Sequence, residues 1–97
     1  MAAYIVVRVD VTDAEQFAEY LKVTPGIIEQ FGGRYLVRGG ERVTLEGEEE
    51  TRRMVIIEFP SMETAQAFYN SDEYAAAIRL REGAATAQFL ALDGVAE

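Results

Sequence analysis

The chain has 97 residues, of which 49% are hydrophobic and 27% are charged, a balance typical of folded globular proteins, and we expect one domain over residues 1–97. Seventeen acidic residues against nine basic ones give a net charge of −8, which repels phosphate backbones and anionic lipids, so we expect no nucleic-acid or membrane partner. Cysteine and histidine are both absent, which excludes disulfides, thiolate nucleophiles and iron–sulfur clusters and removes the usual haem and transition-metal ligands. We therefore expect no metal and no cofactor. No apolar run approaches the roughly 20 residues that cross a bilayer, and no basic signal segment opens the sequence, so a cytoplasmic location is expected.

Four segments have the composition and alternation of strands. Their β-branched and aromatic residues occur in short runs in which polar residues occupy alternate positions, as half-buried strands require. These runs cover residues 4–11, 34–38, 53–59 and 86–92. The acidic tract at residues 46–50 predicts an exposed loop between the second and third strands.

Two helical regions separate these strands. Thr12 and Glu15 have the spacing of a capping box, so the first helix should begin directly after Thr12. Pro25 lacks an amide proton and crowds the preceding turn, which predicts a kink or two short helices. The second region follows Ser61 and restarts at Ser71, because serine is a good helix cap. The resulting βαββαβ order predicts an α+β, ferredoxin-like sandwich with a four-stranded antiparallel sheet.

With both helical regions on one side, the second face of this sheet would be bare. Strand alternation assigns the apolar positions of the second and third strands, Tyr35 and Val37 among them, to the helix side. The opposite set mixes apolar and charged residues. It consists of Tyr4, Val6, Arg8, Asp10, Arg34, Leu36, Arg38, Met54, Ile56, Glu58, Thr86, Gln88, Leu90 and Leu92. Large exposed apolar faces are unusual on monomers, so we expect a homodimer that pairs through this face and encloses a partly polar cavity.

Several motifs resemble one known family. They are residues 31–40 (FGGRYLVRGG), 45–47 (LEG), 57–61 (IEFPS), 69–74 (YNSDEY) and Arg81. Together they resemble the family called domain of unknown function 1330, over nearly the whole chain. The resemblance implies membership of the dimeric α/β-barrel superfamily, whose other members include cofactor-free monooxygenases, lactone isomerases and haem enzymes. It implies a fold without fixing a chemistry, since one fold hosts many functions.

Arginines form the strongest candidate site. Arg34 and Arg38 lie four residues apart, on the same expected open face of one strand, with Arg8 and Glu58 on neighbouring strands of that face. Arginine presents a rigid fork of donors to carboxylates and phosphates, so this cluster predicts a site for a small anionic ligand. In the alternative interpretation, Glu58 and Asp10 pair with the arginines in a structural ion-pair network.

Other candidates lie on loops and helices. Glu46, beside a flexible glycine, and Glu58 are the candidate acids or bases of an enzyme, although Glu46 is also a typical solvated loop residue. Tyr20, Tyr69 and Tyr74 are expected to pack their rings inward with their hydroxyl groups at a cavity rim, where they could touch a ligand. Arg81 is expected to fold onto the sheet edge or to pair with one of two acidic residues. These acidic residues are Asp72 and Glu73.

Three functions fit these features. The first is a dimer that binds or senses a small, anionic organic molecule in a cavity between sheet and partner. The second is a cofactor-independent isomerase or monooxygenase, in which Glu46 or Glu58 moves a proton and an arginine stabilises an enolate. The third is a structural or interaction module without a small ligand.

Overall fold

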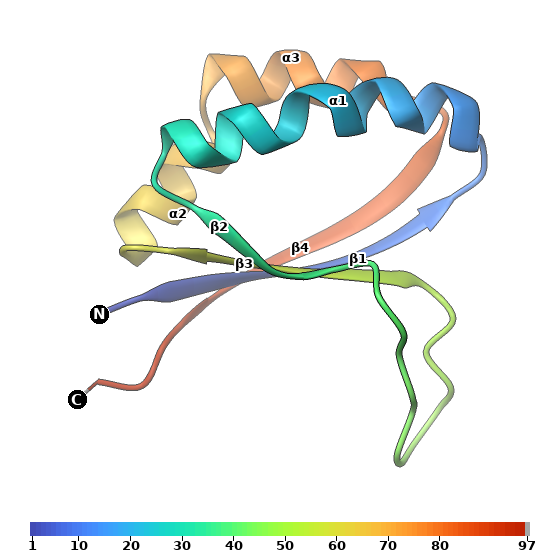
Figure 1. Cartoon of the computed structure of the whole chain (residues 1–97), viewed down its shortest axis with the longest axis horizontal. Helices are drawn as coiled ribbons and strands as arrows, with labels where there is room; N and C mark the ends of the chain where they lie inside the picture. The colour runs from blue at the N-terminus through green and yellow to red at the C-terminus, as the bar shows by residue number, and fades with distance from the viewer. Residues whose placement is uncertain (97) are drawn as a thin grey trace.

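The computed structural model describes residues 1–96 and consists of a four-stranded antiparallel sheet with three helices packed on one face (Figure 1). The strands are β1 (Ala3–Val11), β2 (Arg34–Arg38), β3 (Arg53–Phe59) and β4 (Ala85–Asp93), and the helices are α1 (Ala14–Gln30), α2 (Met62–Tyr69) and α3 (Asp72–Leu80). The strand order is β2-β3-β1-β4, so β1 and β3 are central and β2 and β4 are edges. This arrangement confirms the predicted ferredoxin-like fold.

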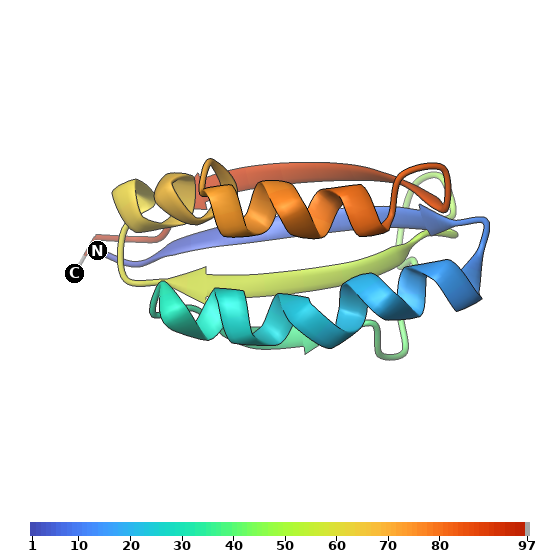
Figure 2. The same ribbon diagram turned by 90° about the horizontal axis from the view of Figure 1, so that it is seen from above.

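The helices form one layer that covers a single face of the sheet, as the view from above shows (Figure 2). The two ends of the described chain lie side by side, because β1 and β4 pair along their whole length and the Gly94 amide donates to the Ala2 carbonyl at 2.8 Å. Among residues 1–96, no helix has both the length and the apolar character that crossing a membrane requires.

The core lies between the helices and the sheet. Along β1 and β3, buried residues alternate with partly exposed ones, as expected for strands with one face in the core. Large side chains from the helices fill the other side of this core. Its largest fully buried members are Tyr74, Phe59, Phe68 and Ile28.

Helix α1 differs from its prediction at both its start and its middle. Asp13 is the cap, with its side chain accepting the Gln16 amide at 3.1 Å, whereas the Thr12 hydroxyl donates to the Ala84 carbonyl. The helix also continues through Pro25 for 17 residues, so the alternative of two short helices is wrong. Tertiary burial of Tyr20 and other α1 side chains offsets the single backbone bond that proline removes.

A β-bulge divides strand β2. Tyr35 pairs with Ile57, but Val37 pairs with Ile56, so Leu36 is an additional residue in the register. Because paired residues share a face, the bulge inverts the second half of the strand. The prediction that Val37 faces the helices and Arg38 faces away is therefore wrong: Val37 joins the open face and Arg38 lies opposite the buried Val55.

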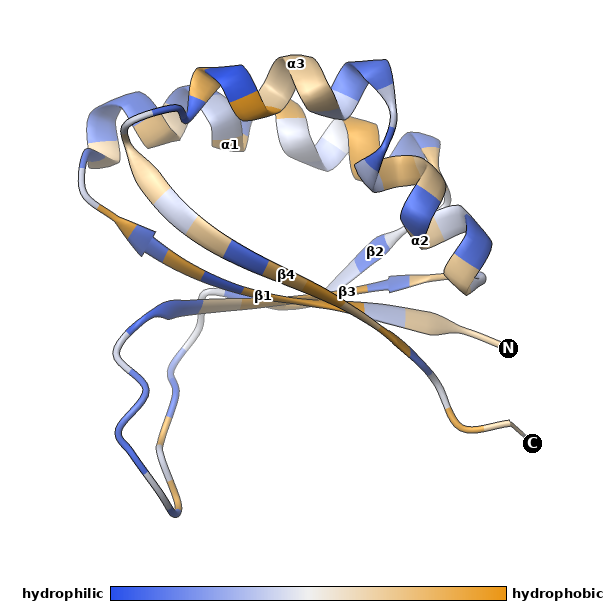
Figure 3. Cartoon of the chain, turned by 180° about the vertical axis from the view of Figure 1, so that it is seen from behind, coloured by the Kyte–Doolittle hydropathy of each residue, from blue (hydrophilic) through white to orange (hydrophobic). Residues whose placement is uncertain are grey.

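The inversion completes an apolar band across the open face. Leu90, Val6, Ile56 and Val37 are successive partners across β4, β1, β3 and β2. The hydropathy colouring shows hydrophobic residues in the middle of the sheet (Figure 3). On the same side, residues 39–52, hereafter the arm, extend away from the sheet and from the helices (Figure 1).

Candidate functional site

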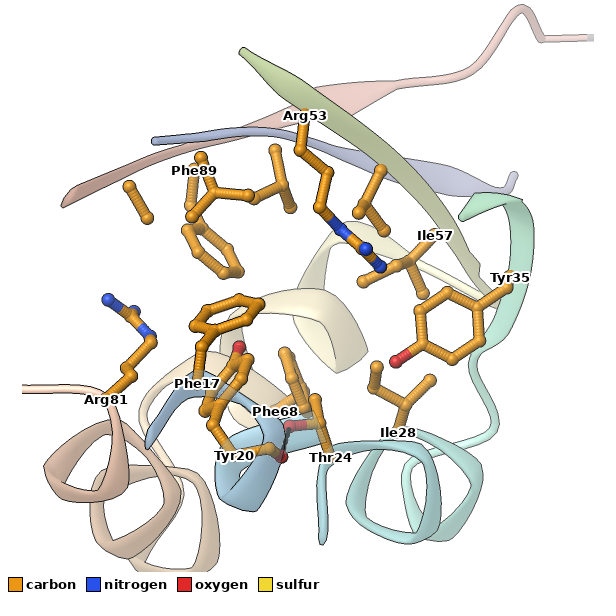
Figure 4. A pocket seen from close by; sticks show the side chains of 14 residues that line it. Phe17, Tyr20, Thr24, Ile28, Tyr35, Arg53, Ile57, Phe68, Arg81 and Phe89 are labelled. Atoms are coloured by element: carbon orange, nitrogen blue, oxygen red, sulfur yellow. Dashed lines mark hydrogen bonds between the residues drawn. The ribbon is translucent and has the colours of Figure 1, made fainter. Parts of the chain in front are cut away.

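The main candidate site is a cavity of about 40 Å³ between the helices and the sheet, hereafter the helix–sheet cavity (Figure 4). Helix α1 supplies one wall and strands β1 and β3 supply the floor. Aromatic rings form much of the remaining lining. They belong to Phe17, Tyr20, Tyr35, Phe68 and Phe89.

Two arginines enter this apolar cavity. Arg53 extends from the start of β3, and Arg81 extends from the C-terminal end of α3 (Figure 4). The Nε atoms of both are buried and have no hydrogen-bond partner among residues 1–96. Buried donors without a partner are costly, and native structures rarely keep them unless a ligand or water satisfies them. The cavity therefore offers two cationic groups whose Nε donors are available to an incoming acceptor.

Arg81 is held by aromatic side chains. Its guanidinium carbon lies 5.2 Å from the centre of the Tyr20 ring and 5.7 Å from that of Phe89, so the cation contacts the negative faces of both rings. Burial alone would lower the pKa of Arg81, but the neighbouring hydroxyl groups of Tyr74 and Tyr20 outweigh it and raise that pKa. Arg81 thus remains a cation, and the prediction that it folds onto the sheet edge is confirmed, since Phe89 lies on edge strand β4.

A pair of tyrosine hydroxyl groups lies beside Arg81. The hydroxyl oxygens of Tyr20 and Tyr74 are 2.6 Å apart, and the Tyr74 side chain is fully buried. Burial raises the pKa of Tyr74, so it stays protonated. Both rings pack inward as predicted, although the Tyr74 hydroxyl lies in the core rather than at a rim.

Tyr35 lines the side of the cavity next to β2, and Arg38 packs on its ring. The guanidinium carbon of Arg38 lies 4.5 Å from the centre of the Tyr35 ring. Burial raises the pKa of the Tyr35 hydroxyl, and the nearby positive charge of Arg38 counteracts part of this effect. Arg38 therefore contacts a residue of the helix–sheet cavity instead of the open face on which it was predicted.

A second cavity, of about 300 Å³, lies between α2 and β4. It shares Arg81, Ala87 and Phe89 with the helix–sheet cavity, so these three side chains separate the two spaces. Tyr69 lines this side cavity with 41% of its surface exposed, which agrees with the prediction of a tyrosine at a rim.

The other arginine candidates remain on the open face, where acidic residues pair with them. Arg34 donates from Nε to Glu58 at 2.6 Å, and Tyr4 donates to the second oxygen of Glu58 at 3.2 Å. The hydrogen bond from Arg34 lowers the pKa of Glu58. Arg8 donates to Glu50 at 3.0 Å. The predicted pairing of Arg34 with Glu58 is confirmed.

Glu46 lies on the arm. It is exposed and lines none of the cavities described for residues 1–96. The chain therefore does not bring Glu46 to Glu58 or to the helix–sheet cavity. No group of acidic side chains in the described part of the chain is arranged to hold a metal ion.

Sequence reasoning missed several cavity residues. Arg53 lies on the same face of its strand as Val55 and Ile57, so the alternation pattern could have predicted its position on the helix side. Phe89 pairs with the buried Val7, so its position on the helix side could have been predicted in the same way. The contact of Arg38 with Tyr35 could not be predicted in this way, because it depends on the bulge.

Comparisons with known proteins agree with this fold. A model of the family described as "Domain of unknown function (DUF1330)" matches residues 2–95, which confirms the resemblance found in the sequence. A protein of unknown function from Rhodopseudomonas palustris is 21% identical with a TM-score of 0.76, covering 99% of this chain and 84% of that one. A dimeric ferredoxin-like protein of unknown function from Jannaschia sp. CCS1 is 11% identical with a TM-score of 0.70, covering 97% of this chain and 100% of that one.

A third similar structure has a named activity. SnoaB, a cofactor-independent oxygenase from Streptomyces nogalater, is 10% identical with a TM-score of 0.65, covering 99% of this chain and 95% of that one. At such identities the similarity shows the fold alone. A search of the curated proteins found no match.

Proposed function

Because the chain belongs to the DUF1330 family, whose name assigns no activity, we propose from the site itself that the protein binds a small anionic organic molecule. The anionic group of the ligand enters the helix–sheet cavity beside Arg81, and its body occupies the adjoining side cavity of about 300 Å³. The protein acts as a homodimer that pairs through the open sheet face. The observation that carries the ligand proposal is the pair of buried, unpartnered Nε donors of Arg53 and Arg81 at one aromatic cavity.

The chemistry of the lining supports an anion with an unsaturated or aromatic body. Two guanidinium groups favour a carboxylate, enolate or phenolate, because charge-assisted hydrogen bonds are the stronger ones. The rings of Tyr69 and Phe89, which line the side cavity, favour a flat apolar body that can stack on them. The net charge of −8 does not oppose this, since the local positive groups are buried away from the screened surface charges.

The apolar band of the open face supports the homodimer. Its edge members Leu90 and Val37 are 42% and 39% exposed, and Leu92 beside them is 51% exposed. A stable pair buries about 1,600 Å² in total, and an apolar centre with a polar rim is typical of such interfaces. The similar protein from Jannaschia is described as dimeric.

The test is a calorimetric titration with two probes of matched shape. 4-Hydroxybenzoate carries the anion, and 4-hydroxybenzyl alcohol lacks it. We expect binding of the first only, and about 10- to 150-fold weaker binding after Arg81→Gln or Arg53→Gln, from the 1.5 to 3 kcal/mol of a charge-assisted bond. Arg79→Gln, an exposed change on the same helix, is the control. Equal affinity for both probes, or no effect of either cavity variant, would refute the anion site.

Mass spectrometry of the intact protein complements this titration. A small molecule retained from the expression host would identify the natural ligand class directly. If neither a retained molecule nor binding of any carboxylate probe is found, a structural or interaction module is the better interpretation.

A second candidate function is a cofactor-independent isomerase or monooxygenase. The Tyr20–Tyr74 hydroxyl pair beside Arg81 supports it, because a phenol can donate a proton while a guanidinium stabilises an enolate. SnoaB, with a similar fold, is named an oxygenase. Glu58 suits the role of base less well, since its ion pair with Arg34 lowers its pKa. Turnover of a bound enol that is lost in Tyr74→Phe would favour this function over binding alone.

A further inference from the structure

The arm presents apolar side chains to solvent although its backbone is well anchored. Leu45 is 92% exposed and Val43 is 70% exposed. Arg42 donates to the carbonyl oxygens of Glu50 at 2.9 Å and Thr51 at 2.7 Å, which ties the two sides of the arm together. The exposed leucine is therefore displayed by an organised segment, which lowers the entropy lost on docking.

The base of the arm is fixed to the end of the open face at which the arm leaves the sheet, hereafter the near end; the opposite end is the far end. Glu50 accepts from Arg8 at 3.0 Å and from Arg52 at 2.9 Å. Around Arg8 this end is mostly polar, because Gln88 and Thr86 face the open side there and only Met54, the partner of Arg8 on β3, is apolar. The near end of a chain thus offers little apolar surface to the tip of its own arm.

The far end of the open face has the complementary character. Leu92 is 51% exposed there, and the Arg34 side chain is 71% exposed. An end groove of about 260 Å³ opens beside Arg34, lined by Ala2, Gly32, Arg34, Glu58, Phe59 and Pro60. In the described chain Arg34 uses only its Nε for Glu58, so its remaining donors are available to a carboxylate.

The arm of a chain is separated from its own end groove. Arg53, where the arm rejoins the sheet, and Glu58, which lines the groove, are five positions apart on β3, about 17 Å along an extended strand. The arm also extends away from the sheet (Figure 1). A second copy stacked on the open face with its strands reversed would bring its own end groove beneath the arm.

We propose that in the homodimer each arm crosses to the far end of the other subunit's open face, with Leu45 in the end groove and Glu46 facing Arg34 of the partner subunit. This placement rests on the homodimer proposed above. It specifies in addition the direction of the two-fold axis of that dimer, which is perpendicular to the strands. The apolar bands of both subunits then meet at the centre. The acidic tip, which also contains Glu48 and Glu49, lies beside the most exposed arginine of that end.

Cross-linking tests this placement directly, because the chain contains no cysteine. In a variant with Leu45→Cys and Ala2→Cys, a short bis-maleimide should convert the dimer into a covalent dimer. The control variant carries Leu45→Cys and Thr86→Cys, which places the second cysteine at the near end, and it should cross-link poorly. Mixing isotope-labelled and unlabelled protein before reaction distinguishes bonds between subunits from bonds within one chain.

Charge exchange provides the second readout. Arg34→Glu and Glu46→Arg should each weaken the dimer about two- to fivefold per contact, as expected for a partly exposed ion pair. The two changes together should restore its dissociation constant. Glu63→Arg, an exposed change on α2, is the control for net charge.

The outcomes separate this placement from the proposed dimer. Cross-linking through position 2 with restoration by the charge exchange supports the crossed arms. A dimer that cross-links through position 86, or through neither position, overturns the placement and leaves the dimer intact. A monomer at micromolar concentration in sedimentation overturns both.

Discussion

Each hydroxyl group of the Tyr20–Tyr74 pair should lower the free energy of unfolding when it is removed alone. The sum of these two losses should exceed the loss that follows when both hydroxyl groups are removed together. The two oxygens lie 2.6 Å apart and Tyr74 is fully buried. In Tyr20→Phe the Tyr74 hydroxyl loses this bond inside the core, which costs about 1 to 3 kcal/mol. For a domain of this size, each kcal/mol lowers Tm by roughly 4 to 8 °C.

The double variant removes both hydroxyl groups, so neither of them is left without its partner in the core. We therefore expect the sum of the two single losses to exceed the double loss by about 1 kcal/mol or more, within the range found for contacting residues. Urea unfolding followed by far-ultraviolet circular dichroism measures all four proteins. The protein concentration must be equal throughout, because the stability of a dimer depends on it.

The reasoning would fail if the two single losses added to the double loss within about 0.5 kcal/mol, which is the behaviour of independent sites. Each hydroxyl group would then have another hydrogen-bond partner, and the two would act independently beside Arg81. Conversely, strong coupling combined with unchanged probe affinity in Tyr20→Phe would assign the pair to the core alone.

Four further results are expected. Ile56→Asp places a charge in the apolar band and should dissociate the dimer, which light scattering would report as a monomer mass; an unchanged dimer mass contradicts the sheet interface. Gly33→Ala should cost about 1 to 3 kcal/mol in urea unfolding, because its Cβ would lie 2.6 Å from the Phe59 ring; unaltered stability means that the ring relaxes freely. Hydrogen bonds, chiefly from Arg52, lower the pKa of Glu50 from 4.5 to about 2. The Glu50 carboxylate therefore stabilises the folded arm fully above pH 4.5, and this stabilisation is lost as the pH falls towards 2. Amide exchange of residues 42–52 should rise in that window relative to the core, and equal protection at both ends of it argues against the anchor. Arg38→Ala should raise the pKa of Tyr35 further, since Arg38 lowers it, and a nuclear magnetic resonance titration in which the assigned Tyr35 ring signals show no change in pKa excludes that contact.

Most of the fold follows from local patterns in the chain. Strand alternation in β1 and β3 and serine caps before α2 and α3 are interactions between near neighbours, so the sequence displays them directly. Where a prediction failed, a tertiary contact had decided the outcome. Thr12 makes no cap because its hydroxyl bonds Ala84, which lies 72 positions away.

The site was harder to predict because it depends on a count of residues rather than on their types. One additional residue at Leu36 sends Arg38 to the helix side and Val37 to the apolar band. Nothing in the composition of β2 signals this insertion. Arg34, before the bulge, was placed on the correct face together with its partner Glu58. Arg53 could have been found, because its phase with Val55 is unbroken.

The bond between Gly94 and Ala2 makes the topology nearly that of a closed ring. A short linker could join these two ends without crossing the sheet, and new ends could then be opened at Gly47, where φ is +93° and a Cβ would contact nothing nearby. Exposed loop tips are the positions at which circular permutation most often succeeds. Such a permuted chain would keep the helix–sheet cavity and every strand pairing while dividing the arm in two, so that ligand binding and arm docking become separable properties of one molecule.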